Sequence, residues 1–198
     1  MIPRPSPIFC PEMIAAILDG RKTQARRVAR LFDPTGTYAA HDDDGCPMTA
    51  DQYGDWRRDA PPHGGPGTIW YLREGLRRSD SGMVVYRQDG CPAWKDGKES
   101  QTWTWLRPTL PAMFMPAWAA RYWLRVEALR VERLQDITEE DATAEGCYWR
   151  PSATACTEAT NVAVFRQLWT RLNGKRPGCA WKDNPFVFVY AFTATEKP

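Results

Sequence analysis

The sequence lacks any apolar run that approaches the ~20 residues a membrane-spanning helix needs. Its first residues, Met1-Ile2-Pro3-Arg4-Pro5, also lack the apolar core of a signal peptide. The first absence excludes a membrane-spanning helix of ordinary length, and the second argues against secretion. We therefore expect a cytoplasmic protein with no membrane partner.

Paired cysteines are missing as well. Six cysteines occur, but no two have the Cys-x-x-Cys spacing that zinc ribbons and thioredoxin-like sites use. Three consecutive aspartates, Asp42 to Asp44, lack the alternating pattern and the closing glutamate of a calcium loop, so a solvated turn is the better interpretation. We expect free thiols, because disulfides are improbable in the cytosol. We expect neither a metal nor another cofactor.

A strong excess of one charge is also absent. The formal net charge of the chain is +2. So small an excess does not indicate a protein that coats nucleic acid, and any contact with a polyanion has to come from local clusters of basic residues. Composition alone leaves nucleic-acid binding undecided.

A chain of 198 residues buries enough surface to stand alone, so we expect a single domain over residues 1–198. Residues 33–67 differ from the rest, because they hold many turn-forming residues with little periodicity between them. We interpret this stretch as a long loop or a loop-rich insertion.

Three segments carry helical patterns. Residues 11–19 begin with proline and place apolar residues at helical spacing, and Gly20 is a natural helix stop. Residues 138–146 begin with a Thr-x-x-Asp pattern that resembles a capping box and end in glycine. Residues 161–172 carry apolar residues at helical spacing that form one stripe, and Gly174 is expected to end this helix.

Four segments carry strand patterns. Residues 68–73 and 83–86 are rich in β-branched and aromatic residues, and we expect them to pair as neighbours. Residues 121–133 alternate imperfectly, which fits a half-buried strand with a bulge. Residues 186–192 are apolar on both faces, which indicates a central strand. The predicted fold is α+β, with a mixed sheet closing into a small barrel and two or three helices packed at its openings.

A cluster of basic residues follows the first predicted helix. Residues 20–27 read Gly-Arg-Lys-Thr-Gln-Ala-Arg-Arg, which combines a helix-ending glycine with a lysine and two adjacent arginines. Lys22 therefore leaves the helix onto a loop or the start of a strand, where its side chain can face a cleft. Because the interior of a small barrel is filled by side chains, a ligand has to bind at a mouth or groove, and this junction is a candidate.

These residues resemble a known family. Gly20, Lys22 and Arg27 fit the Gly-x-Lys-x-x-Glu/Thr-x-Arg signature of the ASCH domain, a small β-barrel fold similar to the PUA domains that bind RNA. The later part of the chain resembles the longer branch of that family associated with phages and prophages. The similar blocks are residues 134–146, Leu168-Trp169, Asn173-Gly174-Lys175-Arg176 and Trp181-Lys182-Asp183-Asn184-Pro185.

The resemblance implies an activity. Within the ASCH family, small amidohydrolases remove the acyl group from the exocyclic amine of N4-acetylcytidine and related nucleosides. They use a lysine, a threonine three positions later and a distant glutamate on a short helix. Carried over to this sequence, the lysine is Lys22 and the glutamate is Glu145, while the threonine position holds Ala25. The implied partner is a modified nucleoside, either free or within RNA or DNA.

Alanine at position 25 departs from this pattern, because it carries no hydroxyl to attack an amide. Three alternatives remain open: an engineered inactive variant of a threonine enzyme, made to trap a ligand; attack by a water molecule assisted by Lys22 and Glu145; or a natural loss of activity. We favour the first, because related phage-type sequences usually read Gly-Arg-Lys-Thr-Gln-Thr-Arg-Arg. Thr23 is a poor substitute nucleophile, since adjacent residues of an extended segment point to opposite faces.

In the implied mechanism, Lys22 acts as base or stabilises the oxyanion, and Glu145 passes a proton to the leaving amine. Glu145 sits near the end of its predicted helix, where its charge opposes the helix dipole, so a purely stabilising role is disfavoured. Arg26 and Arg27 are candidates for phosphate or ribose contacts. Pairing with surface acids, which contributes only ~0.2 to 1 kcal/mol, is an equally good interpretation.

Aromatic residues are abundant, with ten tryptophans in the chain. Most of them are expected to pack in the core, but a pyrimidine ring also needs a flat partner. Tyr71, Trp105 and Trp118 are candidates for that stacking platform. Glu74, in a segment that resembles the Val-Arg-Glu motif of phage-type relatives, is a candidate second acid near the mouth. An ordinary exposed ion pair with Arg73 explains it equally well.

Two functional hypotheses follow. The first is an amidohydrolase acting on N4-acylated cytidine or deoxycytidine. The second is a non-catalytic binding module for RNA or modified nucleic acid, as in PUA-like domains. The ribonuclease activity of some ASCH relatives is a weaker third, because the two histidines, His41 and His63, both lie in the irregular stretch. The residue at position 25 discriminates between the first two hypotheses, because the hydrolase needs a hydroxyl there and the binding module does not.

Overall fold

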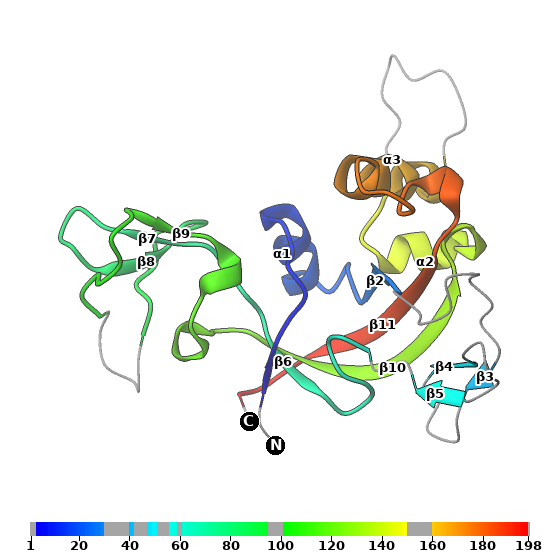
Figure 1. Cartoon of the computed structure of the whole chain (residues 1–198). Coiled ribbons are helices and arrows are strands. Elements are labelled where there is room, and N and C mark those ends of the chain that lie inside the picture. Colours follow the sequence, from blue (N-terminus) through cyan, green and yellow to red (C-terminus); the bar gives the residue numbers. More distant parts are fainter. Residues whose placement is uncertain are drawn as a thin grey trace, which may run out of the picture. The chain divides into compact units, whose positions relative to one another are not determined.

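The computed structural model of the chain describes residues 3–29, 40–41, 47–50, 56–58, 61–94, 101–149 and 160–197. It has a mixed α+β fold, with a curled sheet and three α-helices in this part of the chain (Figure 1). The chain forms two compact units. The first unit comprises residues 1–15, 68–125 and 194–198, and the second comprises residues 16–67 and 126–193.

The main sheet has five strands in the order β1-β6-β10-β11-β2. Their bounds are β1 (Arg4–Pro5), β2 (Gln24–Val28), β6 (Ile69–Tyr71), β10 (Trp123–Arg133) and β11 (Phe186–Thr195). β1 and β6 are parallel, whereas β6 with β10 and β11 with β2 are antiparallel. β10 and β11 are long, bent strands that contribute residues to both units (Figure 1). β11 lies between β10 and β2, which confirms the central position that its apolar sequence predicts. Both of its faces are buried from Val187 to Tyr190.

The three predicted helices are confirmed as α1 (Pro11–Leu18), α2 (Glu139–Ala144) and α3 (Asn161–Asn173). Each of the last two has a threonine at its amino-terminal cap: Thr138 Oγ1 accepts a hydrogen bond from Asp141 N, and Thr160 Oγ1 accepts one from Ala163 N, both at 3.1 Å. Single 3-10 turns occur at Ala112–Phe114, Ala117–Ala119, Leu134–Asp136 and Trp181–Asp183. None of the described helices is long and apolar enough to cross a membrane.

The core of the second unit joins α2 and α3 to one face of β11. Its buried members are Leu134, Ile137, Ala142, Cys147, Phe165, Trp169, Val187 and Val189. The apolar stripe predicted for residues 161–172 supplies Phe165 and Trp169, and the indole of Trp169 donates to the carbonyl of Cys179 at 2.8 Å. Burial of this stripe fixes α3 against the sheet.

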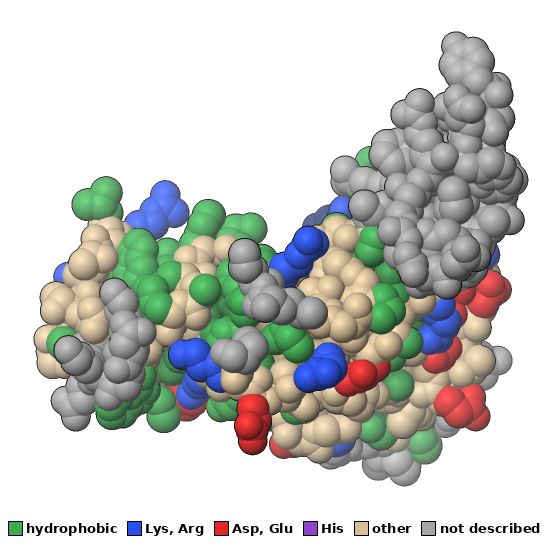
Figure 2. All heavy atoms as spheres, turned by 90° about the horizontal axis from the view of Figure 1, so that it is seen from below, with side chains coloured by type: hydrophobic (Ala, Val, Ile, Leu, Met, Phe, Trp, Pro, Cys, Tyr) green, Lys and Arg blue, Asp and Glu red, His purple; other side chains and the backbone are tan. Residues whose placement is uncertain are grey.

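The first unit contains a second, three-stranded sheet in the order β8-β7-β9. Its strands are β7 (Leu76–Arg78), β8 (Val84–Tyr86) and β9 (Thr109–Leu110). The core behind it consists of Leu76, Val84, Tyr86, Ala93, Trp103, Leu110, Met115 and Ala119. Hydrophobic side chains also gather on the outside of this part of the unit (Figure 2), where Trp94, Leu106, Met113 and Phe114 are exposed.

The predicted pairing of residues 68–73 with residues 83–86 is wrong. The first segment forms β6, which pairs with β1 and β10, and the second forms β8, which pairs with β7. β7 and β8 are joined by a tight turn in which Ser79 N donates to Met83 O at 2.9 Å. Closing so short a loop has a small entropic cost, which favours β7 as the partner of β8.

Within the stretch 33–67, the structure describes three short strands, β3 (Ala40–His41), β4 (Pro47–Ala50) and β5 (Trp56–Arg58), paired in that order. The turn-rich sequence does not predict them. Asp42 to Asp44 lie outside the described residues. A single domain with a loop-rich insertion stays a prediction.

Substitution of Gly146 tests the packing just after α2. Gly146 has a φ of 81°, in the left-handed region, and an alanine Cβ there would lie 3.2 Å from Lys22 Cβ and 3.4 Å from Ala16 Cβ. We expect Gly146→Ala to lower the free energy of unfolding by more than the ~1–2 kcal/mol that this backbone conformation costs a non-glycine residue. Urea-induced unfolding measures the loss.

Gly178→Ala is the matched control. Gly178 also has a positive φ, of 68°, but no atom of the described residues, its chain neighbours aside, lies within 4 Å of the place that an alanine Cβ would occupy. This variant should show the backbone cost alone. Equal losses in the two variants would contradict a packing role for the contact between Gly146 and Lys22.

Candidate active site

Lys22 and Glu145 meet although 123 residues separate them in sequence. Their backbones form an antiparallel β-bridge, flanked by a hydrogen bond from Thr23 N to Ala144 O at 2.9 Å. Lys22 Nζ donates to Glu145 Oε2 at 2.6 Å and to the carbonyl oxygen of Glu145 at 2.8 Å. The segment after α1 and the end of α2 therefore place the two side chains together.

The pair is buried: the side chains of Lys22 and Glu145 are 2% and 4% exposed. Charges taken out of water lose hydration, so such a pair persists only when direct contacts replace the lost water. The two bonds from Lys22 Nζ provide part of this replacement.

Arg26 provides the rest from β2. Its side chain has no exposed surface, and its guanidinium contacts Glu145 Oε1 at 3.2 Å, Asp141 Oδ2 at 2.9 Å and Glu132 Oε1 at 2.5 Å. Gln24 accepts a further bond from Arg26 Nη1 at 2.8 Å. A buried arginine that retains its charge requires such a set of acceptors.

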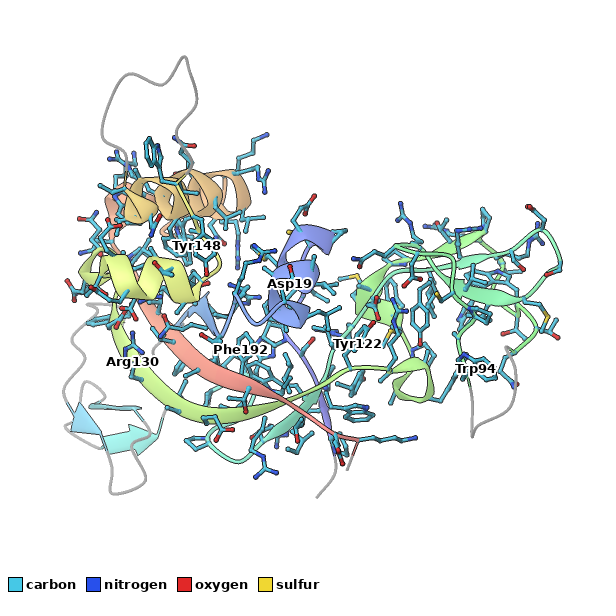
Figure 3. The ribbon with its side chains drawn as sticks, turned by 180° about the vertical axis from the view of Figure 1, so that it is seen from behind. Asp19, Trp94, Tyr122, Arg130, Tyr148 and Phe192 are labelled. Carbon is cyan, nitrogen blue, oxygen red and sulfur yellow. The ribbon has the colours of Figure 1, made fainter. Side chains whose placement is uncertain are left out.

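Arg130 completes the network from β10, bonding to both Glu132 and Asp141 at 2.8 Å; Figure 3 labels it beside α2. We call the resulting group the ion cluster. It consists of three cations and three carboxylates: Lys22, Arg26, Arg130, Glu132, Asp141 and Glu145. The balance of charges explains how so many ionised groups are accommodated together.

Ala25 points away from Gln24 and Arg26, because successive residues of a strand face opposite sides of the sheet. It is fully buried, and in the register of β2 with β11 it lies directly opposite Tyr190. Directly opposed residues share a face. Position 25 therefore shares its face of the sheet with Arg27 and Tyr190.

This face carries two groups with shifted titration. Burial lowers the pKa of Arg27, while the negative charge of Glu145 opposes that shift. Burial raises the pKa of Tyr190, so its phenol stays protonated over the ordinary pH range. The ring of His63 meets the ring of Tyr190 edge-on, with centroids 5.9 Å apart. The charge of Glu145 thus acts on both sides of β2, on Arg26 and on Arg27.

Several participants were not predicted from the sequence. Gln24, Glu132 and Asp141 are part of the network around Arg26, and Tyr190 and His63 lie on the face of position 25. One of these contacts has a signal in the sequence: Gln24 and Arg26 are two residues apart, so they share a face if the segment is a strand. For Arg26 itself, the interpretation as a partner of acids holds, but these acids form a buried cluster and not a surface pair.

The other candidate residues, Tyr71, Glu74, Trp105 and Trp118, belong to the first unit. Glu74 is 2% exposed, and its two carboxylate oxygens each accept a bond from Arg121 at 2.7 Å. The exposed ion pair with Arg73 is therefore wrong. The three aromatic residues are partly buried against the core of the first unit. Their stacking role stays a prediction.

A cavity of about 450 Å³ lies in the second unit. Arg21 and Gly146 line it, and these residues adjoin Lys22 and Glu145 in sequence. The ion pair itself does not line the cavity. The second unit thus contains a polar cluster whose central members, Lys22, Arg26 and Glu145, are buried and, next to it along the chain, an open cavity.

Comparison of the chain with models of known families, with curated proteins and with solved structures gave no match. In the described part of the chain, no group of three or more histidine, cysteine, aspartate or glutamate side chains is arranged to hold a metal ion. The four cysteines described, Cys10, Cys91, Cys147 and Cys179, are free thiols. Any interpretation of the site therefore depends on its own geometry.

The ion cluster predicts a loss of stability in acid. Burial alone would raise the pKa of Asp141, but the charge of Arg26 and the bond from Arg130 outweigh it, and this pKa lies below its ordinary value of 3.8. A carboxylate with a lowered pKa stabilises the fold above its unfolded pKa, and this contribution is lost as pH falls through the folded value. We therefore expect Asp141→Asn to be less stable at neutral pH and to show a shallower decline in acid.

Urea-induced unfolding at neutral pH and at a series of pH values below about 4 measures this difference. Asp80→Asn is the control, because Asp80 is exposed and has no ion pair within the described residues. It should leave the pH dependence unchanged. An identical slope in wild type and Asp141→Asn would contradict the prediction.

Proposed function

We propose that this chain has a PUA-like ASCH fold and the active-site scaffold of an amidohydrolase that removes the acyl group from N4-acylated cytidine or deoxycytidine. The observation that carries the proposal is the 2.6 Å contact between Lys22 Nζ and the carboxylate of Glu145. A lysine and a glutamate from distant segments form a hydrogen bond along which a proton can pass between carboxylate and amine. The residues named by the resemblance are the two that meet.

In the proposed reaction, Lys22 first passes a proton to the carboxylate of Glu145 and becomes a neutral amine. As the ion cluster opens, this amine turns toward the face of position 25, where it takes the proton from the hydroxyl of a threonine while that hydroxyl attacks the acyl carbon. The resulting oxyanion is stabilised by hydrogen-bond donors, with Lys22 the nearest candidate. The bond between the acyl carbon and N4 then breaks, and Glu145 delivers a proton to the leaving amine. Water hydrolyses the acyl ester and releases a carboxylic acid.

The described arrangement corresponds to a closed state. Glu145 Oε2 is bonded to Lys22 and Oε1 to Arg26, and Ala25 is fully buried. A pyrimidine that reaches position 25 has to enter on the face of Tyr190. Part of the ion cluster then rearranges so that Glu145 becomes available to the leaving amine.

A second candidate is a binding module for RNA or modified nucleic acid that does not turn over its ligand. The observation that favours it is the combination of an alanine at position 25 with a carboxylate whose two oxygens already have partners. Such a scaffold binds a base without breaking a bond. In both proposals the partner is a modified nucleoside, either free or within a polymer.

Restoration of the hydroxyl tests the hydrolase. We expect Ala25→Thr to release cytidine from N4-acetylcytidine, whereas the present chain does not, because only the variant has a nucleophile. Adding Glu145→Gln to that variant should lower kcat by on the order of 10²- to 10⁴-fold, through loss of the proton shuttle. Chromatographic detection of cytidine measures both effects.

Ala25→Val is the matched control, because valine has the volume of threonine without its hydroxyl. It should be folded to the same extent and inactive. If Ala25→Thr is folded, binds the nucleoside and releases no product, the hydrolase is excluded and the binding module is supported.

A further inference from the structure

The cavity next to the ion cluster has one wall formed by a single face of α3. Val164, Gln167, Leu168 and Arg171 line it, and their spacing of three, four and seven residues places them on one side of the helix. Val164 and Leu168 also pack against the core, so they form an apolar floor. Gln167 and Arg171 are exposed and add an amide and a guanidinium.

A second wall is formed by the segment that follows the end of α2. Tyr148 is 38% exposed, its hydroxyl donates to the carbonyl of Arg21 at 3.2 Å, and Figure 3 labels it beside α3. Cys147 is buried, and burial raises the pKa of its thiol to about 11, so it contributes a neutral surface. This wall therefore adds an aromatic ring that the bond to Arg21 holds in place.

The charged residues in the described part of the lining have one sign. Arg21 and Arg171 line the cavity, and none of the described lining residues is a carboxylate. Arg21 shares its charge with Asp19 at 2.7 Å, in an exposed pair. For Arg171, no hydrogen bond or ion pair is present within the described residues. Two guanidiniums beside an apolar floor attract a ligand that is anionic at one end and flat or apolar at the other.

We propose that this cavity binds a nucleoside 5′-phosphate. The phosphate lies against Arg21 and Arg171, because guanidiniums pair with phosphate through two parallel hydrogen bonds. The base lies over Val164 and Leu168 beside Tyr148, where the amide of Gln167 can bond to its edge. A cavity of about 450 Å³ falls within the usual size range of small-molecule sites. This site is separate from the ion cluster and does not require the proposed hydrolase activity.

Calorimetric titration of the full chain with cytidine 5′-monophosphate tests the proposal, with cytidine and inorganic phosphate as comparison ligands. We expect the monophosphate to bind tightest. Arg171→Gln should weaken its affinity on the order of tenfold, as expected for loss of a charged hydrogen-bond donor, and should leave the weak binding of cytidine unchanged. Arg176→Gln is the matched control, because Arg176 is exposed, carries the same charge and does not line the cavity.

Three outcomes would overturn the proposal: no binding of the monophosphate, equal binding of inorganic phosphate, or equal effects of Arg171→Gln and Arg176→Gln. A short single-stranded oligonucleotide distinguishes the two sources of the phosphate. If it binds more tightly than the monophosphate and Arg171→Gln abolishes the difference, the cavity holds one nucleotide of a strand. If it binds no more tightly, the ligand is a free nucleotide. These measurements involve no turnover, so failure of the hydrolase proposal leaves them interpretable.

Discussion

The buried guanidinium of Arg26 is the constraint on which the second unit depends. A buried charge without partners is strongly destabilising. The three carboxylate partners of Arg26 are Glu132 on β10, Asp141 on α2 and Glu145 at the end of α2. β2, β10 and α2 therefore have to meet in one register for the charge to be accommodated. A polar network thus sets the relative positions of elements that apolar packing alone would specify less strictly.

The same network links stability to the proposed chemistry. Glu145 balances the charges of Lys22 and Arg26, and it is also the candidate proton shuttle. A group with both roles cannot be released to a substrate without weakening the cluster, since an ion pair in a low-dielectric interior is costly to break. A tightly held carboxylate suits a module that binds without turnover. A carboxylate that a substrate can release suits an enzyme.

The ion cluster and the cavity are linked along the chain. Lys22 and Glu145 form the β-bridge, and their neighbours Arg21 and Gly146 line the cavity. Arg21 lines the cavity, while the side chain of the next residue, Lys22, is buried against Glu145, so one short bridge adjoins both a buried pair and an open site. The left-handed backbone of Gly146 brings the segment after α2 close to Lys22, a spacing that a side chain would disturb.

Local pattern in the sequence was sufficient to predict the three helices and the long strands, because spacing, caps and stop residues act within a few turns of the chain. The meeting of Lys22 and Glu145 was expected only through the resemblance, since no local rule connects residues 123 positions apart. Tertiary structure alone decided that Arg121 is the partner of Glu74, and that residues 83–86 pair with β7. The physical reason is that a charge or a strand edge accepts many partners, and only the packing of the whole chain selects one.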